Sequence, residues 1–376
     1  MKTLVVGGGM SGLTYAILAA KNGEDVTVCE RNARVGRKIA MSGNGKCNIA
    51  NVNTDPSCYN DSEIVRAVLA KVKLADYLRF LSEQGIVTYT DECGRMYPVT
   101  DSASTVVDCL RFQAAKFGVT IRTETVVRSV KQTSHGYVAE IDGNKENFDK
   151  VVVACGSRSQ ATETEIGTLV DKKCLTPCAP SLVPVRVVGM NGILNGIRNR
   201  AEVRLVCDGK TVGSERGEIQ FKDYGLSGMC VFNLSAIIAR SVVRGEKHEY
   251  KFVVDLLPDI TPNELQKYIS ANLARGMQPL TGLVKNKLAE YIYKQTNNDT
   301  EQIAHYTKNM PFIFDKLLDY SMSQVTTGGV DEKFVDKQTL ALPNGVVVLG
   351  EALNVDGICG GHNLYFAAAS AMYLFM

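Results

Sequence analysis

Three glycines near the N-terminus have the spacing of a nucleotide-binding turn. Gly7, Gly9 and Gly12 form the pattern G-x-G-x-x-G directly after the apolar run 4–6. The first glycine permits a tight turn, the second lets the backbone approach a pyrophosphate, and the third lets a helix pack closely on a strand. The start of that helix would face the phosphates, because its free N–H groups and its dipole attract anions. The pattern therefore predicts a dinucleotide cradle, and a glycine-rich turn without a ligand is the alternative.

Glu30 stands where the ribose of such a dinucleotide would lie. It follows a second apolar run, 26–29, about twenty residues after the glycines. A carboxylate there accepts hydrogen bonds from ribose hydroxyls, and it suits NAD as well as FAD. Gly36 comes six residues later and is followed by Arg37. This extension resembles the FAD version of the fingerprint in glutathione-reductase-like proteins, and a basic surface loop is the alternative.

A second glycine-rich segment, 36–48, has the sequence GRKIAMSGNGKCN. Its glycines, serine and cations are typical of a loop whose backbone N–H groups bind an anion. A mobile surface loop explains the same spacing. Cys47 in this loop is a candidate reactive thiol, but no second cysteine lies nearby in the sequence, so we favour a small structural residue.

A third glycine-rich segment, 350–364, has the sequence GEALNVDGICGGHNL. It follows the buried-strand candidate 346–349 and precedes a predicted closing helix over 367–375, so its amides can also face an anion. His362 in this segment has an ordinary pKa near neutrality, which suits proton delivery to a substrate. A polar side chain that only packs is the alternative. The four histidines lack metal-ligand spacing, and we predict no metal site.

The elements that would position these segments read as a Rossmann-type α/β domain. Runs 4–6 and 26–29 are predicted strands around a helix that reaches Ala20. Helices are expected over 63–84 and 106–117, followed by a strand and a β-meander that returns to the sheet at 151–153.

The pattern of expected secondary structure changes after Pro177. Short strands with glycine turns are expected over 185–255, interrupted by an apolar stretch at 229–239, and helices over 261–308. Thr261 is a predicted N-cap before Pro262. We therefore expect a discontinuous FAD-binding domain over 1–185 and 321–376, an inserted β-rich substrate domain over 186–258, and a small helical subdomain over 259–320.

Composition narrows the class of protein. The chain has 376 residues, of which 45% are hydrophobic and 22% charged, as in a folded protein of two or three domains. The chain has 42 Lys and Arg residues and 40 Asp and Glu residues. It therefore lacks the excess of positive charge that is typical of proteins that bind nucleic acid. No apolar run reaches the ~18 residues of a membrane span. The first ten residues do not resemble a signal peptide, and the 11 scattered cysteines suggest reduced thiols in the cytoplasm.

Segment 36–48 is similar to the G-R-K-…-M-S-G-G-G-R-C-N signature of the BaiN-like (YhiN-like) family of bacterial flavoproteins. The 350–364 segment resembles that family's G-E-x-L-D-V-D-G-x-C-G-G-Y-N-L, with Asn354 for Asp and His362 for Tyr. The resemblance covers essentially the whole chain, with further similar segments at 94–98, 180–184, 217–228 and 326–330. Departures at 154–157, in the short 157–176 stretch and at Met229 fall on the substrate side and leave the substrate's identity open.

The resemblance implies that FAD is bound by all three glycine-rich segments together with residues near the sheet. The implied cofactor-binding residues are Gly7, Gly9, Met10, Ser11, Gly12, Glu30, Arg31, Arg37, Lys38, Ser42, Gly43, Gly45, Cys47, Asn48, Val127, Ala154, Gly156, Gly350, Glu351, Asp356, Gly360, Gly361, Asn363 and Leu364. The catalytic candidates are His362, Cys47 and Tyr224, with Tyr97 and Lys222 as weaker hydrogen-bond donors.

The activity implied by the resemblance is reduction of C=C bonds in hydrophobic enones, such as oxo-bile-acid or steroid-like dienones, by an FAD-dependent oxidoreductase. A flavin-dependent amine or aminoketone oxidase, a flavin-binding RNA-modification or accessory protein, and a non-catalytic flavin-binding protein are the alternatives. The sequence has no second G-x-G-x-x-G for a nicotinamide cofactor. NADH or NADPH would then dock transiently, or a separate redox protein would deliver the electrons.

Overall fold

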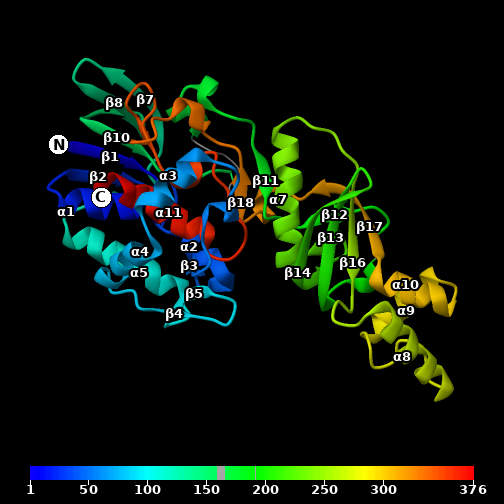
Figure 1. Cartoon of the computed structure of the whole chain (residues 1–376). Coiled ribbons are helices and arrows are strands. Elements are labelled where there is room, and N and C mark those ends of the chain that lie inside the picture. The colour runs from blue at the N-terminus through cyan, green and yellow to red at the C-terminus, as the bar shows by residue number, and fades with distance from the viewer. Residues whose placement is uncertain (159–165, 191) are drawn as a thin grey trace. The chain divides into compact units, whose positions relative to one another are not determined.

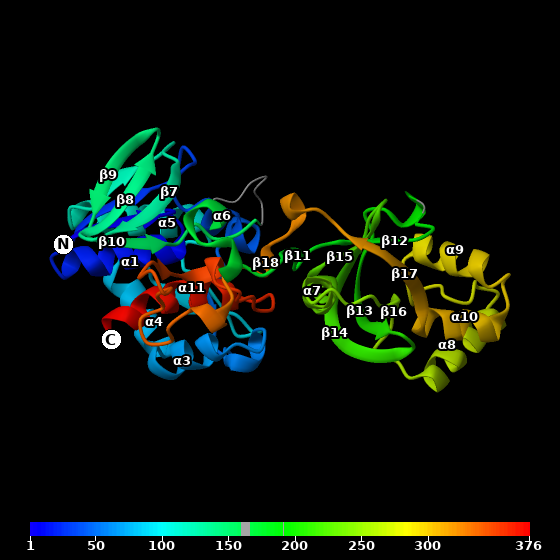
Figure 2. The same cartoon turned by 90° about the horizontal axis from the view of Figure 1, so that it is seen from above.

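The computed structural model describes residues 1–158, 166–190 and 192–376, which form two units. Unit 1 comprises residues 1–179 and 325–376, and unit 2 comprises residues 180–324 (Figure 1, Figure 2). Both ends of the chain therefore belong to unit 1, as a discontinuous nucleotide-binding domain requires. The expected domain bounds at 185 and 321 assigned a few residues of unit 2 to this domain.

A five-stranded sheet forms the centre of unit 1, and neighbouring strands in it are parallel. In spatial order its strands are β19 (Val347–Val348), β10 (Lys150–Val153), β1 (Lys2–Val6), β2 (Asp25–Cys29) and β6 (Thr120–Arg122). The apolar runs in β1 and β10 are buried, as expected for parallel strands that are covered on both faces. The predicted Rossmann-type fold is confirmed.

Helix α1 (Met10–Lys21) connects β1 to β2 and packs against α11 (His362–Met372). Both views show these two helices close together, although one begins at residue 10 and the other at residue 362 (Figure 1, Figure 2). Most residues of both helices are buried, because α1 also packs on β2 and α5 and α11 also packs on α3 and α4.

The remaining elements of unit 1 surround this core. They are α2 (Arg37–Met41), β3 (Ala50–Asn51), α3 (Glu63–Lys71), α4 (Leu74–Glu83), β4 (Thr88–Thr90), β5 (Arg95–Pro98), α5 (Ala103–Lys116), β7 (Val127–Thr133), β8 (Gly136–Ile141), β9 (Asn144–Phe148) and α6 (Ile166–Leu169). β18 (Val325–Thr327) also belongs to unit 1, and β11 (Ala179–Ser181) spans the boundary between residues 179 and 180. The expected single helix over 63–84 is wrong: the backbone N–H of Lys73 donates to Asp76 at 3.0 Å and starts a new helix there.

A closed six-stranded barrel forms the centre of unit 2. In barrel order its strands are β12 (Val185–Val187), β15 (Gly225–Ser227), β14 (Lys210–Phe221), β13 (Arg198–Cys207), β16 (Tyr250–Asp255) and β17 (Met310–Leu317). The apolar stretch at 229–239 lies in helix α7 (Met229–Val243), which packs on β14. Gly213 permits that contact, because a Cβ built there would lie 2.8 Å from the Ile237 side chain.

Helices α8 (Pro262–Ala274), α9 (Asn286–Gln295) and α10 (Thr300–Lys308) complete unit 2. The sequence suggested a separate helical subdomain over 259–320, and the structure differs. Leu265, Leu288 and Ile303 belong to one buried apolar core with the barrel strands. In addition, β17 lies inside the supposed helical range and pairs with β12 and β16.

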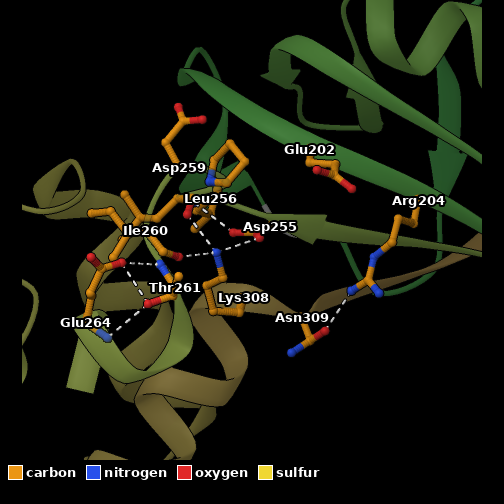
Figure 3. A network of polar contacts seen from close by, with 12 residues as sticks. Glu202, Arg204, Asp255, Leu256, Asp259, Ile260, Thr261, Glu264, Lys308 and Asn309 are labelled. Atoms are coloured by element: carbon orange, nitrogen blue, oxygen red, sulfur yellow. Dashed lines mark hydrogen bonds and ion pairs between the residues drawn. The ribbon is translucent and has the colours of Figure 1, made fainter.

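Polar contacts attach these helices to the barrel (Figure 3). Lys308 Nζ forms an ion pair with Asp255 at 2.7 Å and donates to the carbonyl groups of Leu257 and Ile260. Thr261 and Glu264 form the capping box that starts α8. The predicted N-cap at Thr261 is confirmed.

All 11 cysteines lie in the described ranges, and none of them forms a disulfide bond there. No helix within those ranges is both long enough and apolar enough to cross a bilayer.

Candidate cofactor-binding site

Backbone packing explains two of the three N-terminal glycines. Gly7 has a φ of 104°, and a Cβ built on it would lie 2.5 Å from the carbonyl oxygen of Ala154. A Cβ on Gly12 would collide with the carbonyl oxygen of Gly7. The two glycines therefore let the start of α1 approach the end of β10 closely.

Gly9 has no such requirement. Its φ is −83°, and a Cβ built on it would meet no atom within 4 Å. Gly9 is also the N-cap of α1, and no side chain caps this helix. The Cβ position of Gly9 thus borders open space at the start of α1, which is where a pyrophosphate would bind. Met10 and Ser11 are buried in the same turn.

Glu30 is buried and fixed beside this turn. Its carboxylate accepts hydrogen bonds from the backbone N–H groups of Gly8 and Asn32, both at 2.9 Å. Its own backbone bonds to Arg122 and Thr125, in the chain around β6. Val127 is buried at the start of β7, Arg31 is half-buried, and Arg37 is exposed. The acid therefore has the position expected for a ribose acceptor.

Lys38 and Glu351 bring the second and third glycine-rich segments together. They form an ion pair, although 313 residues separate them. Glu351 also accepts from the Ser157 hydroxyl and, at 2.9 Å, from the backbone N–H of Thr326. Gly156 lies beside this pair, since a Cβ on it would be 3.5 Å from Lys38 Nζ.

Three further contacts join the N-terminal segments to the C-terminal segment. A Cβ on Gly350 would lie 2.8 Å from Ser11 Oγ, so the C-terminal turn touches the first turn of α1. Asn51 Nδ2 donates to the carbonyl oxygen of Gly360 at 3.2 Å. A Cβ on Gly361 would lie 2.7 Å from Asn48 Oδ1. Segments 7–12, 36–51 and 350–364 therefore form one site.

A buried acceptor in this site suits a ligand that donates hydrogen bonds. Asn48 Oδ1 is buried and finds no hydrogen-bond partner among residues 1–158, 166–190 and 192–376. A buried acceptor without a partner costs about 1–3 kcal/mol, which a ligand N–H or O–H would relieve. The N-cap of α11, Gly361, also provides no side-chain cap. With the open space at Gly9, these features fit an elongated, anionic and hydrogen-bonding cofactor such as FAD.

His362 is buried at the first position of α11, with 3% of its surface exposed. Its Nδ1 is 2.9 Å from Thr54 Oγ1, and the Tyr59 hydroxyl donates to its backbone carbonyl oxygen at 2.8 Å. Burial lowers the pKa of His362 to about 4, with Asp55 acting weakly in the opposite direction. The expected near-neutral pKa is therefore wrong. At neutral pH the ring is therefore uncharged. It can donate or accept hydrogen bonds, but it carries no extra proton to transfer.

Cys47 does not have the environment of a reactive thiolate. Its side chain is fully buried, and burial raises the pKa of its thiol to about 11. The thiol is therefore protonated at neutral pH, and the nucleophile is the thiolate. The candidate role of Cys47 as a catalytic thiol is corrected to that of a small packing residue in the glycine loop.

Several other predicted cofactor residues use their side chains within the protein. Asn363 accepts from the backbone N–H of Gly357 at 2.8 Å and donates to its carbonyl oxygen at 2.9 Å. Ser42 donates to the carbonyl oxygen of Ile39 at 2.7 Å. Asp356 is fully buried, and Leu364 is half-buried. Gly43 and Gly45 have positive φ values of 57° and 85° in the loop. Because the side chains of Ser42 and Asn363 form hydrogen bonds within the protein, a cofactor at this site would contact their backbone atoms.

Tyr224 and Lys222 lie in unit 2, between β14 and β15, so they are not among the groups that unit 1 brings together. Tyr97 lies on β5 in unit 1 and stacks on Tyr89 at 5.8 Å. A Cβ on Gly43 would lie 3.5 Å from the Tyr97 ring. Sequence reasoning missed the partners of the site, namely Thr54, Tyr59, Asn51 and Ser157. Nothing in their spacing identifies them, because they act through contacts with distant residues.

Comparison with known proteins identifies the family. The model of the HI0933-like protein Rossmann domain matches residues 1–374. The chain belongs to this family. It is an FAD-dependent oxidoreductase, as the resemblance to the BaiN-like flavoproteins implied.

Curated relatives match the chain along nearly its whole length. It is 30% identical to a 3-dehydro-bile acid delta(4,6)-reductase of Clostridium scindens, over 97% of this chain and 96% of that protein. It is 27% identical to a ribosomal RNA dihydrouridine synthase of Haemophilus influenzae, over 98% and 96%.

Solved structures with some likeness include the open form of a flavocytochrome c3 fumarate reductase, at 14% identity and a TM-score of 0.47, over 99% of this chain and 76% of that chain. A 3-ketosteroid-delta4-(5alpha)-dehydrogenase from Rhodococcus jostii has 13% identity and a TM-score of 0.44, over 99% and 95%.

Proposed function

We propose that the chain reduces carbon–carbon double bonds conjugated to a carbonyl group in hydrophobic substrates of the oxo-bile-acid or steroid-like class. The observation that carries this proposal is the 30% identity to the bile acid delta(4,6)-reductase of C. scindens. The alignment spans 97% of the chain and therefore includes unit 2 as well as the cofactor-binding unit. The likeness is thus not explained by FAD binding alone.

The residues of unit 1 suit the chemistry of such a reduction. When bound, reduced FAD would supply the hydride for the β-carbon of the enone, and a proton from water would complete the reduction at the α-carbon. The open start of α1 at Gly9 and the acid Glu30 would hold the pyrophosphate and the ribose. The remaining requirement is a donor that withdraws electron density from the substrate carbonyl.

His362 is the donor that we propose. Thr54 engages Nδ1 of the ring, which leaves Nε2 for a ligand. Gly360 keeps room beside that atom, since a Cβ there would lie 3.1 Å from Nε2. Because the ring is uncharged at neutral pH, it would donate a hydrogen bond and not transfer its proton outright. Tyr224 of unit 2 is a second donor candidate. NADH, NADPH or a redox donor protein would reduce the flavin.

A second candidate function is reduction of uridine in ribosomal RNA. It is favoured by the 27% identity to the dihydrouridine synthase of H. influenzae over 98% of the chain. The double bond of the uracil ring is also conjugated to a carbonyl, so the same hydride chemistry would serve. The net charge of +2 provides little attraction for an extended phosphate backbone. We therefore place this candidate second.

An anaerobic single-turnover experiment distinguishes the candidates. The purified flavoprotein is reduced with dithionite and mixed with a 3-oxo-Δ4 bile acid or with unmodified ribosomal RNA. We expect the bile acid to reoxidise the flavin and to gain two hydrogens by mass. Reoxidation by the RNA alone would favour the second candidate, and reduction of the oxidised flavin by amines would favour an oxidase.

Variants of two histidines test the donor. His362→Phe should retain FAD and slow the single turnover, because the carbonyl loses its hydrogen bond. His135→Gln is the matched control, because His135 is exposed on the loop between β7 and β8. Equal rates for His362→Phe and the wild type would reduce His362 to a packing residue.

A further inference from the structure

The barrel of unit 2 brings three potential metal ligands together at one end. Within the described parts of the chain, Cys207, Asp208 and His248 are the group in which one ligand atom from each residue lies within 4.8 Å of the others. Asp208 Oδ2 is 2.6 Å from His248 Nδ1 and 3.9 Å from Cys207 Sγ. Forty residues separate Asp208 from His248, and the pairing of β13 with β16 joins them. This is why the sequence alone predicted no metal site.

The backbone holds Asp208 in a defined position. Asp208 and Gly209 have φ values of 46° and 82°, as in the two-residue turn of a β-hairpin. This turn joins β13 to β14, and the chain exchanges two hydrogen bonds with the start of β16. Asp208 N donates to the carbonyl oxygen of Glu249 at 3.0 Å, and Glu249 N donates to Asp208 Oδ1 at 2.9 Å. Since Oδ1 is engaged by the backbone, Oδ2 is the oxygen that faces Cys207 and His248.

We propose that Cys207, Asp208 and His248 bind a Zn²⁺ ion at this end of the barrel, with water as the fourth ligand. One sulfur, one imidazole nitrogen and one carboxylate oxygen are ligands that Zn²⁺ accepts in tetrahedral sites. Zinc–ligand bonds of about 2.0–2.3 Å place such atoms about 3.3–3.8 Å apart. The Sγ–Oδ2 separation is already near that range, and the Asp208–His248 contact opens by less than ~1 Å.

The surroundings support a metal-bound imidazole. His248 Nε2 is 3.7 Å from Glu246 Oε2, and Arg244 holds Glu246 through two hydrogen bonds of 2.7 and 2.9 Å. A carboxylate behind the second ring nitrogen is the arrangement that commonly orients a metal-binding histidine. The side chains of His248 and Asp208 are 34% and 54% exposed, so the ion can enter without opening the barrel. On binding, the thiol of Cys207 loses its proton to solvent.

The ion would join the β13–β14 hairpin to the start of β16. It would stabilise unit 2 by mass action, since the unfolded chain does not hold the three ligands together. This site does not depend on the proposed reaction.

Co²⁺ is the spectroscopic probe for this site. We expect the full-length flavoprotein to bind a single Co²⁺ per chain with intense tetrahedral bands at wavelengths beyond the flavin absorption, and Zn²⁺ to displace it. Cys207→Ser, Asp208→Asn and His248→Gln should each weaken binding at least tenfold. Cys93→Ser and His135→Gln, which replace exposed residues of unit 1, should bind as the wild type does.

A second measurement needs no variant. Zn²⁺ should slow alkylation of Cys207 at least tenfold and leave that of Cys93 unchanged, as followed by peptide mass spectrometry. Absence of tetrahedral Co²⁺ bands, wild-type binding by Cys207→Ser, loss of binding in the two control variants, or alkylation that Zn²⁺ does not slow would each overturn the proposal. In those cases Asp208 and His248 form an ordinary surface ion pair.

Discussion

Two helices of unit 1, α1 and α11, begin differently from two helices of unit 2, α8 and α10. In unit 1, α1 and α11 start at Gly9 and Gly361, and neither glycine has a side chain that could cap the first turn. In unit 2, α8 and α10 start at Thr261 and Asp299, whose side chains accept from N–H groups of the first turn. The protein thus satisfies the helix starts of α8 and α10 by itself. The starts of α1 and α11 receive no such side-chain cap.

Helix α7 shows that a missing side-chain cap does not by itself indicate a ligand. It also starts at a glycine without a cap, Gly228, but a Cβ there would collide with the carbonyl oxygen of Glu218. Packing inside unit 2 therefore explains that glycine. At Gly9 a Cβ would meet nothing within 4 Å, so the protein itself does not require glycine. An uncapped helix start therefore indicates a ligand when open space accompanies it, as at Gly9. At Gly361 a Cβ would collide with the carbonyl oxygen of Ala50, so the sign of a ligand at the start of α11 is the unpartnered Asn48 Oδ1 beside that glycine.

The largest effect is expected from Gly9→Asp. A carboxylate would occupy the space at the start of α1 and repel a pyrophosphate, so FAD should be lost almost completely while the fold persists. Flavin absorbance after gel filtration and far-ultraviolet circular dichroism measure the two effects. Gly228→Ala is the matched change in unit 2. It should retain FAD and lose about 1–3 kcal/mol of unfolding free energy through backbone strain. If Gly9→Asp kept the flavin content of the wild type, the space at Gly9 would not be a pyrophosphate site, and Gly9 would not differ from Gly228 in this respect.

Lys308→Met should have the next largest effect. It leaves Asp255 without its ion-pair partner in a place where the two side chains are only 11% and 16% exposed. Removing one partner of a buried pair costs about 3–5 kcal/mol. Denaturant unfolding should show this loss with flavin content unchanged. In contrast, Lys173→Met removes an exposed ion pair with Asp171 and should cost less than ~1 kcal/mol. Equal losses for the two variants would mean that Lys308 does not anchor the helices.

His362 should make the stability of unit 1 depend on pH. Burial lowers its pKa from 6.5 to about 4, so the unfolded chain binds a proton in this window and the folded chain does not. The unfolding free energy should therefore fall as the pH drops from 6.5 towards 4, by about 3 kcal/mol in total. His362→Gln should remove this part of the pH dependence, as measured by denaturant unfolding at several pH values. The same slope in both proteins would contradict the neutral, buried ring.

Thr261→Ala should have the smallest effect. It removes the side chain that accepts from Glu264 N at 3.3 Å, and the loss of an N-cap costs about 1 kcal/mol. Flavin content should not change, because Thr261 belongs to unit 2. A larger loss, or a loss of flavin, would mean that the start of α8 has a role beyond capping.

Local patterns predicted the features whose cause is local. The G-x-G-x-x-G pattern located the start of α1, because it marks the tight turn between a strand and the helix that follows it. Thr261, Pro262 and Glu264 located the start of α8 for the same reason, since a capping box spans four residues.

Features that depend on distant residues were missed. The apolar periodicity continues through Val72 to Leu78, so it did not reveal that α3 ends at Lys71. The ion pair of Lys38 with Glu351 joins residues that are 313 positions apart. The low pKa of His362 and the high pKa of Cys47 arise from burial, which the sequence does not display.

Hydrogen–deuterium exchange of the apoprotein with and without FAD tests the central claim most directly. We predict that FAD slows exchange both in residues 7–13 and in residues 358–364, because one ligand contacts both helix starts. Exchange in residues 201–220 of the barrel should not change. Protection confined to one of the two ends, or absent from both, would contradict the account.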